Sequence, residues 1–216
     1  LNKALCIFVL SQDFKNELIR RGIKSDIHLT STKVPDYFIS GFDLSMRQGK
    51  AENIMYSGRI EKAKGVYETV DTFSILKSQY KDLTLTFVGD GSELPMLKQY
   101  VENKKIKDVR FTGELRGEDF KKEYINADMY LFLSYTEGMP TVVLEAMIFG
   151  LPIFTRKVGG LIDFFENGKM GYISSSLDPV VFAEAMKPYI ESSAKMKSVS
   201  LYNSEYARTH FIASVV

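Results

Sequence analysis

The sequence predicts an α/β protein with a Rossmann-like, doubly wound parallel sheet, and three observations support that fold class. Short apolar runs rich in branched and aromatic residues alternate with longer amphipathic stretches, which is typical of βα units around a parallel sheet. Gly, Asn, Asp or Pro marks the boundaries between these segments. The 216 residues suffice for one full domain and part of another.

Six strands are expected in the main body, with helices between them. The predicted strands are Asn53 to Ser57, Leu83 to Val88, Val109 to Thr112, Met129 to Leu133, Pro152 to Thr155 and Gly171 to Ile173. The predicted helices are Val66 to Tyr80, Ser92 to Asn103, Gly117 to Ala127, Pro140 to Phe149, Leu161 to Glu166, Pro179 to Glu191 and Lys195 to Thr209. In such sheets, ligands bind beyond the carboxyl ends of the strands.

The first part of the chain has a different organisation. It reads as a strand, a helix, a short strand and a polar linker: Leu5 to Leu10, Gln12 to Arg21, Asp26 to Thr30 and Ser31 to Gln48. We therefore expect residues 1–46 to be the end of a preceding domain with its linker. Residues 47–195 are expected to form the main domain, and residues 196–216 a C-terminal helix that ends early, at Val216.

Composition narrows the function classes. The 28 basic and 27 acidic residues give a net charge of +1, which provides no global field for binding nucleic acid. The longest apolar run, Ala4 to Leu10, is far shorter than the roughly 20 residues of a membrane span. The single cysteine, Cys6, lies in that run and is expected to be a buried thiol. These features predict a cytoplasmic protein.

The loop after the first body strand has the residues of an anion site. Gly58 and Arg59 follow that strand directly, and Lys64 lies at the start of the next helix. Glycine lets the backbone approach a ligand, and two cations near a helix N-terminus suit a diphosphate. A solvated loop with ordinary charges is the alternative.

Two further strand-to-helix turns are rich in glycine. One is Gly89-Asp90-Gly91, and the other contains Gly159 and Gly160. Each turn alone is also compatible with simple turn chemistry, and the first does not complete a dinucleotide-binding fingerprint. Several strand ends with ligand-compatible residues together indicate one binding site.

The segment after the fourth body strand carries two carboxylates, Glu137 and Glu145, separated by seven residues. Pro140 is suited to the first helical position, so the free amides of the opening turn are expected to face an anion. The helix is apolar nearly all round, and Glu145 therefore needs a partner. Ribose hydroxyls would fit, and a structural salt bridge is the alternative.

Metal binding is not supported by the sequence. It contains no Asp-x-Asp triplet, and the two histidines, His28 and His210, lie far apart. We therefore expect no metal site and no cofactor, with Arg59 and Lys64 supplying the positive charge.

The stretch from Asn53 to about Ile190 resembles the C-terminal domain of retaining glycosyltransferase family 4, which has the GT-B fold. Glu137 and Glu145 match its pair of glutamates, and Arg59 and Lys64 match its Gly-Arg and Lys-Gly pair. Other matching positions are Gly89-Asp90-Gly91, Phe111-Thr112-Gly113, Ala127-Asp128 and Gly159-Gly160. Two positions depart from the family pattern, since Asp163 replaces a common Glu and Leu133 a common Pro.

The resemblance implies a donor-binding domain for a UDP-sugar or a GDP-sugar. Arg59 and Lys64 would neutralise the diphosphate, Glu145 would hold the ribose, and Glu137 would lie near the transferred sugar. The backbone around Gly138, Met139, Pro140 and Thr141 would grip phosphate or sugar, and the glycine turns would line the donor site.

The resemblance also implies partners. The sugar would pass with retention to a saccharide or lipid-linked acceptor, as in polysaccharide biosynthesis, and a missing N-terminal domain would bind that acceptor. A lipid acceptor would bring the protein to the inner face of a membrane, although the basic residues of the first helix equally suit a solvated face. They are Lys15, Arg20, Arg21 and Lys24.

Two other functions stay open at this point. One is a nucleotide-sugar-binding module that is inactive as an isolated fragment, and the other is a GT-B nucleotide-sugar epimerase. Glycoside hydrolysis by the two glutamates is disfavoured, because it would not need the neighbouring cations.

Overall fold

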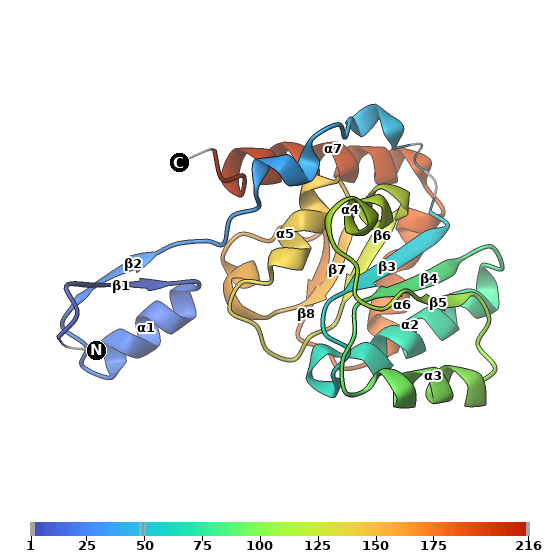
Figure 1. The fold of residues 1–216 in the computed structure, drawn as a ribbon, viewed down its shortest axis with the longest axis horizontal. Helices are drawn as coiled ribbons and strands as arrows, with labels where there is room; N and C mark the ends of the chain where they lie inside the picture. Colours follow the sequence, from blue (N-terminus) through green and yellow to red (C-terminus); the bar gives the residue numbers. More distant parts are fainter. Residues whose placement is uncertain (1–2, 48, 50, 215–216) are drawn as a thin grey trace.

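The computed structural model describes residues 3–47, 49 and 51–214. The predicted linker end at Gln48 and chain end at Val216 lie outside the described residues. The main body contains the expected parallel sheet of six strands, in the order β5-β4-β3-β6-β7-β8 (Figure 1). The strands are β3 (Asn53–Ser57), β4 (Thr84–Val88), β5 (Val109–Phe111), β6 (Met129–Phe132), β7 (Ile153–Arg156) and β8 (Gly171–Ser174). The predicted fold class is confirmed.

Helices cover both faces of this sheet. The helices are α2 (Val66–Gln79), α3 (Leu94–Asn103), α4 (Gly117–Asn126), α5 (Thr141–Ile148), α6 (Pro179–Ile190) and α7 (Ser193–His210). Chain order reverses direction across the sheet after β5, and right-handed crossovers therefore place α4 and α5 on the opposite face from α2 and α3. Helix α6, which follows the last strand, packs against α2, and α7 packs against α5.

Two of the predicted helices differ from the helices that the structure contains. Pro140 is the N-cap of α5 with ψ 102°, so the helix begins at Thr141 rather than at the proline. The helix expected over Leu161 to Glu166 is wrong, because this segment forms a 3-10 turn, η4 (Gly159–Asp163). It starts from Gly159 at φ +50°, and turn residues with the isolated bridge between Asn167 and Gly171 follow it before β8.

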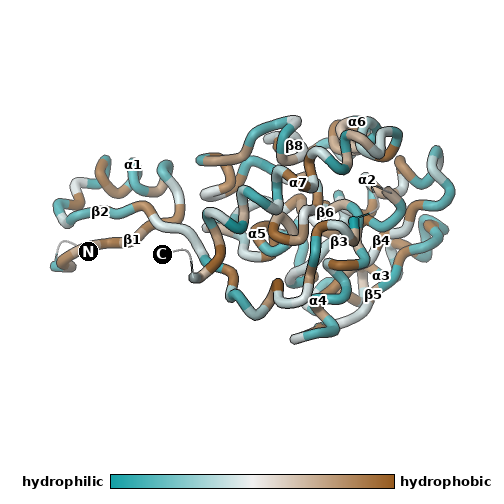
Figure 2. Tube along the Cα trace, turned by 90° about the horizontal axis from the view of Figure 1, so that it is seen from above, coloured by the Kyte–Doolittle hydropathy of each residue, from teal (hydrophilic) through white to brown (hydrophobic). Residues whose placement is uncertain are grey.

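The first elements form a small parallel βαβ unit beside the main body (Figure 1). It comprises β1 (Cys6–Val9), α1 (Gln12–Arg20) and β2 (Asp26–Leu29). Its strand β1 is hydrophobic along its length (Figure 2), yet Leu5 is 97% and Phe8 67% exposed. The prediction of a buried Cys6 thiol is wrong, since Cys6 is exposed on this uncovered two-stranded sheet.

The segment predicted as a polar linker packs tightly on the main body. Val34, Phe38 and Phe42 are buried in the core, and Val34 pairs with Ile212 beyond the end of α7. Two short 3-10 turns, η1 (Asp36–Ile39) and η2 (Leu44–Met46), carry the chain across the helices. The apolar side chains of this segment are scattered among polar and turn-forming residues, which gave too weak a pattern to predict this packing.

The Arg47 side chain binds the end of that segment to the main body. Its guanidinium donates to the carbonyls of Phe149, Ile125, Ala127 and Tyr124, which lie at the ends of α4 and α5. Burial lowers the Arg47 pKa to about 10, with Asp128 opposing the shift.

No described helix has the length and apolar character needed to cross a membrane.

Candidate functional site

Two adjoining cavities lie above the carboxyl ends of β3, β4 and β6. The Lys64 cavity measures about 280 Å³ and is lined by Gly58, Arg59, Lys64, Phe132, Glu137, Met139, Pro140, Thr141 and Val142. The Asp90 cavity measures about 340 Å³ and is lined by Gly58, Arg59, Val88, Gly89, Asp90, Glu114, Leu115, Phe120 and Val142. Arg59 lies at their junction, because it lines both. A further cavity of about 290 Å³ lies at the opposite end of these strands, around Asn53, Thr84 and Asp108.

The loop after β3 holds Arg59 at this junction. The Tyr56 hydroxyl donates to the Arg59 carbonyl at 2.8 Å, and the next amide, from Ile60, donates to the Asp90 carbonyl. The loop backbone is thus tied both to β3 and to the loop after β4. The Arg59 side chain is 69% exposed and its guanidinium pairs with Glu61 at 2.9 Å, so the charge is available at the cavity mouth.

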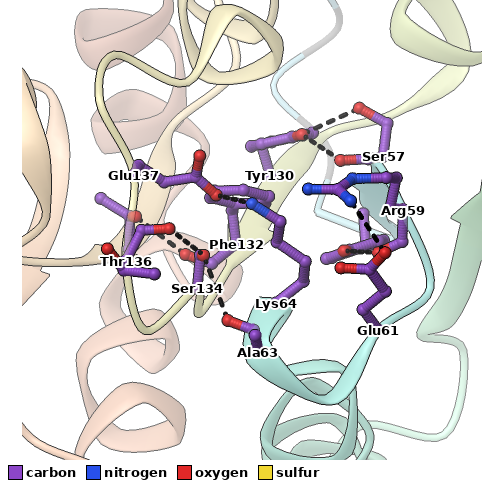
Figure 3. A network of polar contacts seen from close by, with 12 residues as sticks. Ser57, Arg59, Glu61, Ala63, Lys64, Tyr130, Phe132, Ser134, Thr136 and Glu137 are labelled. Carbon is purple, nitrogen blue, oxygen red and sulfur yellow. Dashed lines mark hydrogen bonds and ion pairs between the residues drawn. The ribbon is translucent and has the colours of Figure 1, made fainter. Parts of the chain in front are cut away.

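Lys64 and Glu137 form an ion pair inside the Lys64 cavity (Figure 3). The Lys64 Nζ lies 2.7 Å from Oε1 of Glu137, and the two side chains are 15% and 14% exposed. Lys64 ends the 3-10 turn η3 (Lys62–Lys64), just before α2. Two predicted residues that lie 73 positions apart in sequence therefore meet at the site.

Ser134 fixes the loop that carries Glu137. Its hydroxyl lies 3.3 Å from the Ala63 carbonyl and 3.2 Å from the Thr136 carbonyl (Figure 3), and the Tyr135 amide donates to Ala63 at 2.9 Å. Because Ala63 belongs to η3, the loop after β6 and the turn bearing Lys64 are held together. The Lys64–Glu137 distance is a consequence of this backbone docking.

The start of α5 presents free donors to the Lys64 cavity. The amides of Thr141 and Val142 have no hydrogen-bond acceptor among the described residues, as expected for a first helical turn. Pro140, which lacks an N–H, accepts from Val143 at 3.0 Å. Two backbone donors and two cations thus surround a cavity that suits an anion.

Glu145 lies one turn after Thr141 on α5. Its Oε2 accepts a hydrogen bond from the Tyr124 hydroxyl at 2.8 Å. Burial raises the pKa of Glu145 above its usual value of 4.5, and the Tyr124 hydrogen bond opposes the shift. Glu145 therefore has a protein partner, although a hydroxyl rather than the salt bridge that was the alternative.

The predicted glycines serve mainly to bring backbones together. A Cβ on Gly89 would lie 2.0 Å from the Gly58 carbonyl oxygen, so the loops after β3 and β4 touch. Gly91 lies close to Ile60 in the same way. Asp90 lines its cavity, and its side chain accepts from the Gly91 amide.

The glycine pair after β7 contacts other loops rather than either cavity. The Gly160 amide already donates to the Gly138 carbonyl at 2.7 Å. A Cβ on Gly160 would lie 2.1 Å from the Leu10 carbonyl oxygen, and Asp163 accepts from the Gln12 amide at 2.8 Å. Gly138, Gly160 and Asp163 thus contact the βαβ unit at the start of α1, whereas Gly159 packs on Gly138 and Glu137.

Several lining residues were not predicted from the sequence. Glu114 and Leu115 follow β5, and Phe120 lies on α4; all three line the Asp90 cavity. Their position after a predicted strand was a usable signal. Tyr124 and Ser57 gave no comparable signal.

The two histidines do not meet at this site. His28 stacks on Phe8 in the βαβ unit, and His210 on Tyr206 in α7. Among the described residues, no three His, Cys, Asp or Glu side chains form a group able to hold a metal ion. On α1, Arg20 and Arg21 pair with Glu17.

Comparison with curated proteins finds glycosyltransferases and related proteins. The chain is 29% identical over 149 residues to a glycogen synthase of Mycobacterium tuberculosis, covering 68% of this chain and 36% of that protein. It is 32% identical over 111 residues to the putative teichuronic acid biosynthesis glycosyltransferase TuaC of Bacillus subtilis, covering 51% and 26%. The chain therefore spans about a third of the length of these relatives.

Solved structures share the fold at low sequence identity. HepE of Anabaena, in complex with UDP and glucose, matches with a TM-score of 0.82 and 20% identity, over 97% of this chain and 60% of that one. TarM of S. aureus, in a complex that includes UDP, matches with a TM-score of 0.86 and 17% identity, over 99% and 43%. These likenesses agree with the GT-B fold that the sequence resemblance implied.

The family model described as "Glycosyl transferases group 1" matches residues 45–206. This range contains every strand of the main sheet and both cavities. The chain belongs to the glycosyl transferases group 1 family.

Proposed function

We propose that this chain is the donor-binding part of a retaining hexosyltransferase that uses a UDP-sugar or a GDP-sugar. The observation that carries the proposal is the Lys64 cavity. Two cations, two free amides and a carboxylate converge there, beyond the carboxyl ends of parallel strands.

Each of the two cavities binds a different part of the donor. The diphosphate lies against Arg59 and the α5 amides, with the transferred sugar on the Glu137 side of the Lys64 cavity. The nucleoside lies in the Asp90 cavity, where Leu115 and Phe120 supply apolar surface. Glu145, on the helix between them, accepts hydrogen bonds from the ribose.

Transfer would depend chiefly on charge stabilisation. Negative charge develops on the diphosphate as the glycosidic bond breaks, and preorganised cations and amides stabilise it. Arg59 and Lys64 supply that charge without a metal ion. The leaving phosphate takes the acceptor proton on the same face, which gives retention, so Glu137 binds sugar and is no covalent nucleophile.

The sugar acceptor would bind to an N-terminal domain. Leu5, just before β1, and Phe8, within it, expose apolar surface, which supports packing of the βαβ unit against further parts of an N-terminal domain. That domain would bind a saccharide or a lipid-linked acceptor, in the second case at a membrane surface.

Assays of the full-length protein that carries this chain test the proposal. Transfer from UDP-sugars and GDP-sugars is measured for the wild type, Lys64→Ala and Glu145→Ala, and NMR gives the anomeric configuration of the product. We expect a retained configuration and a loss of kcat/KM of about 100-fold in Lys64→Ala. Unchanged transfer in both variants would defeat the site assignment, and an inverted product would defeat retention.

A further inference from the structure

A chain of buried hydroxyl groups ends at Glu145. Ser57 Oγ lies 2.8 Å from the Tyr130 hydroxyl and 2.9 Å from the Tyr124 hydroxyl, and the Tyr124 hydroxyl lies 2.8 Å from Oε2 of Glu145. Ser57, Tyr124 and Tyr130 are at most 1% exposed. Figure 3 shows the Ser57–Tyr130 end of this chain.

The number of protons that each hydroxyl group can donate determines the direction of these hydrogen bonds. An ionised Glu145 only accepts, so Tyr124 donates its single hydroxyl proton to Glu145. Tyr124 then accepts from Ser57, which uses the one proton of Ser57, and the Tyr130 hydroxyl donates to Ser57, whose Oγ and carbonyl oxygen lie 2.8 and 3.1 Å from it. The Ser57 and Tyr124 hydroxyl dipoles therefore point toward the carboxylate, and each of these bonds polarises the next.

This row of hydrogen-bonded hydroxyl groups connects the two sides of the proposed donor site. Ser57 directly precedes Gly58 and Arg59, which line both cavities. At the other end, Oε2 of Glu145 is held by Tyr124. The remaining oxygen, Oε1, has no hydrogen-bond partner among the described residues and is not one of the fully buried atoms without a partner.

Resting on the proposed function, we propose that Tyr124 is a positioning residue for recognition of the donor ribose. Its hydroxyl, oriented by Ser57 and Tyr130, fixes the Glu145 carboxylate so that Oε1 faces the ribose hydroxyls. A glutamate has several rotatable bonds, and holding one oxygen removes most of that freedom before the ligand arrives. Tyr124 itself touches no part of the donor.

Calorimetry with two probes separates positioning from general structure. The probes are UDP and 2′,3′-dideoxy-UDP, or the guanine pair if GDP binds more tightly, and the protein is the full-length chain. We expect Tyr124→Phe to weaken UDP binding about tenfold, the size of one hydrogen bond to a charged group. Binding of the dideoxy probe should change less than about twofold, because it lacks the hydroxyls that Glu145 receives.

Two more variants control this test. Tyr189→Phe removes another buried tyrosine hydroxyl, which donates to the Gly171 carbonyl at 3.0 Å away from the site, and it should leave both probes unaffected. Ser57→Ala breaks the next link and should weaken UDP binding selectively, about threefold. It keeps the proposal testable if Tyr124→Phe does not fold.

The outcomes distinguish this proposal from the proposed function. An equal loss for both probes in Tyr124→Phe, or no loss for UDP, overturns the positioning role while the donor site stands. A wild type that binds UDP no more tightly than the dideoxy probe overturns the ribose role of Glu145 and, with it, that of Tyr124. A wild type that binds neither nucleoside diphosphate contradicts the donor site itself.

Discussion

The Nζ of Lys64 lies 2.7 Å from Oε1 of Glu137, and the pair is about 85% enclosed by the surrounding loops, its side chains being only 15% and 14% exposed. The proposed diphosphate-binding cation and the proposed sugar-side carboxylate are therefore each other's partner. Each side chain orders the other, and removing one leaves the other charge enclosed without a partner.

Breaking this ion pair should cost stability in a non-additive way. Lys64→Met and Glu137→Gln should each lower the free energy of unfolding by about 1–3 kcal/mol, because the remaining group loses its partner. The double variant should lose clearly less than the sum of the two single losses. Urea denaturation of the four proteins measures the coupling, and strictly additive losses would show that the contact contributes nothing.

Glu145 should make stability depend on pH, since burial raises its pKa above 4.5. Between that value and the raised pKa, the folded state binds more protons than the unfolded state, so wild-type stability falls as pH rises. Glu145→Gln removes this titration. We expect the variant to gain stability over the wild type from about pH 4.5 upward, until the folded carboxyl is fully ionised.

Urea denaturation of wild type and Glu145→Gln across this pH range measures the difference. The same variant should bind nucleoside diphosphate more weakly, because a neutral amide accepts hydrogen bonds less strongly than a carboxylate. A difference that shrinks as pH rises would contradict the raised pKa.

Replacing Arg47 should lower the free energy of unfolding strongly. Its guanidinium satisfies four carbonyls at the ends of two helices, and Arg47→Ala should lower stability by about 3 kcal/mol. Arg47→Lys should restore little, because an ammonium cannot reproduce the planar donor set. Lys122→Ala, which removes an exposed ion pair with Asp119, is the control and should cost less than about 1 kcal/mol. Equal melting temperatures for Arg47→Ala and the control would contradict this role.

Gly89 should tolerate no side chain. Alanine there would place its Cβ 2.0 Å from the Gly58 carbonyl oxygen, which pushes apart the loops after β3 and β4. Gly113 is the matched control, because its φ is also positive, at +74°, but no atom lies within 4 Å of an added Cβ. Gly113→Ala should cost about 1 kcal/mol from backbone strain and Gly89→Ala at least about 2 kcal/mol, as measured by denaturation. Similar costs would mean that the close approach is not important.

The main sheet and most of the candidate site were predictable, because their signals are local in sequence. Strands alternate with helices at regular spacing, and the residues that follow each strand converge by topology alone, as Lys64 and Glu137 do. Tyr124 was not predictable, since its partners Ser57 and Glu145 lie 67 and 21 residues away. The same limit applies to Arg47, which contacts helix ends 77 to 102 residues later. Cys6 shows the opposite failure, because an apolar run predicts burial only where something covers it.

Calorimetric titration of the protein with UDP and with GDP tests the proposed donor site at the Lys64 cavity. One of the two nucleotides should bind at one site per chain, with a dissociation constant of roughly 1 μM to 1 mM, the usual range for such substrates. Lys64→Ala should bind this nucleotide at least about tenfold more weakly. Absence of binding to either nucleotide at millimolar concentration, or binding that Lys64→Ala leaves unchanged, would contradict a donor site at the Lys64 cavity.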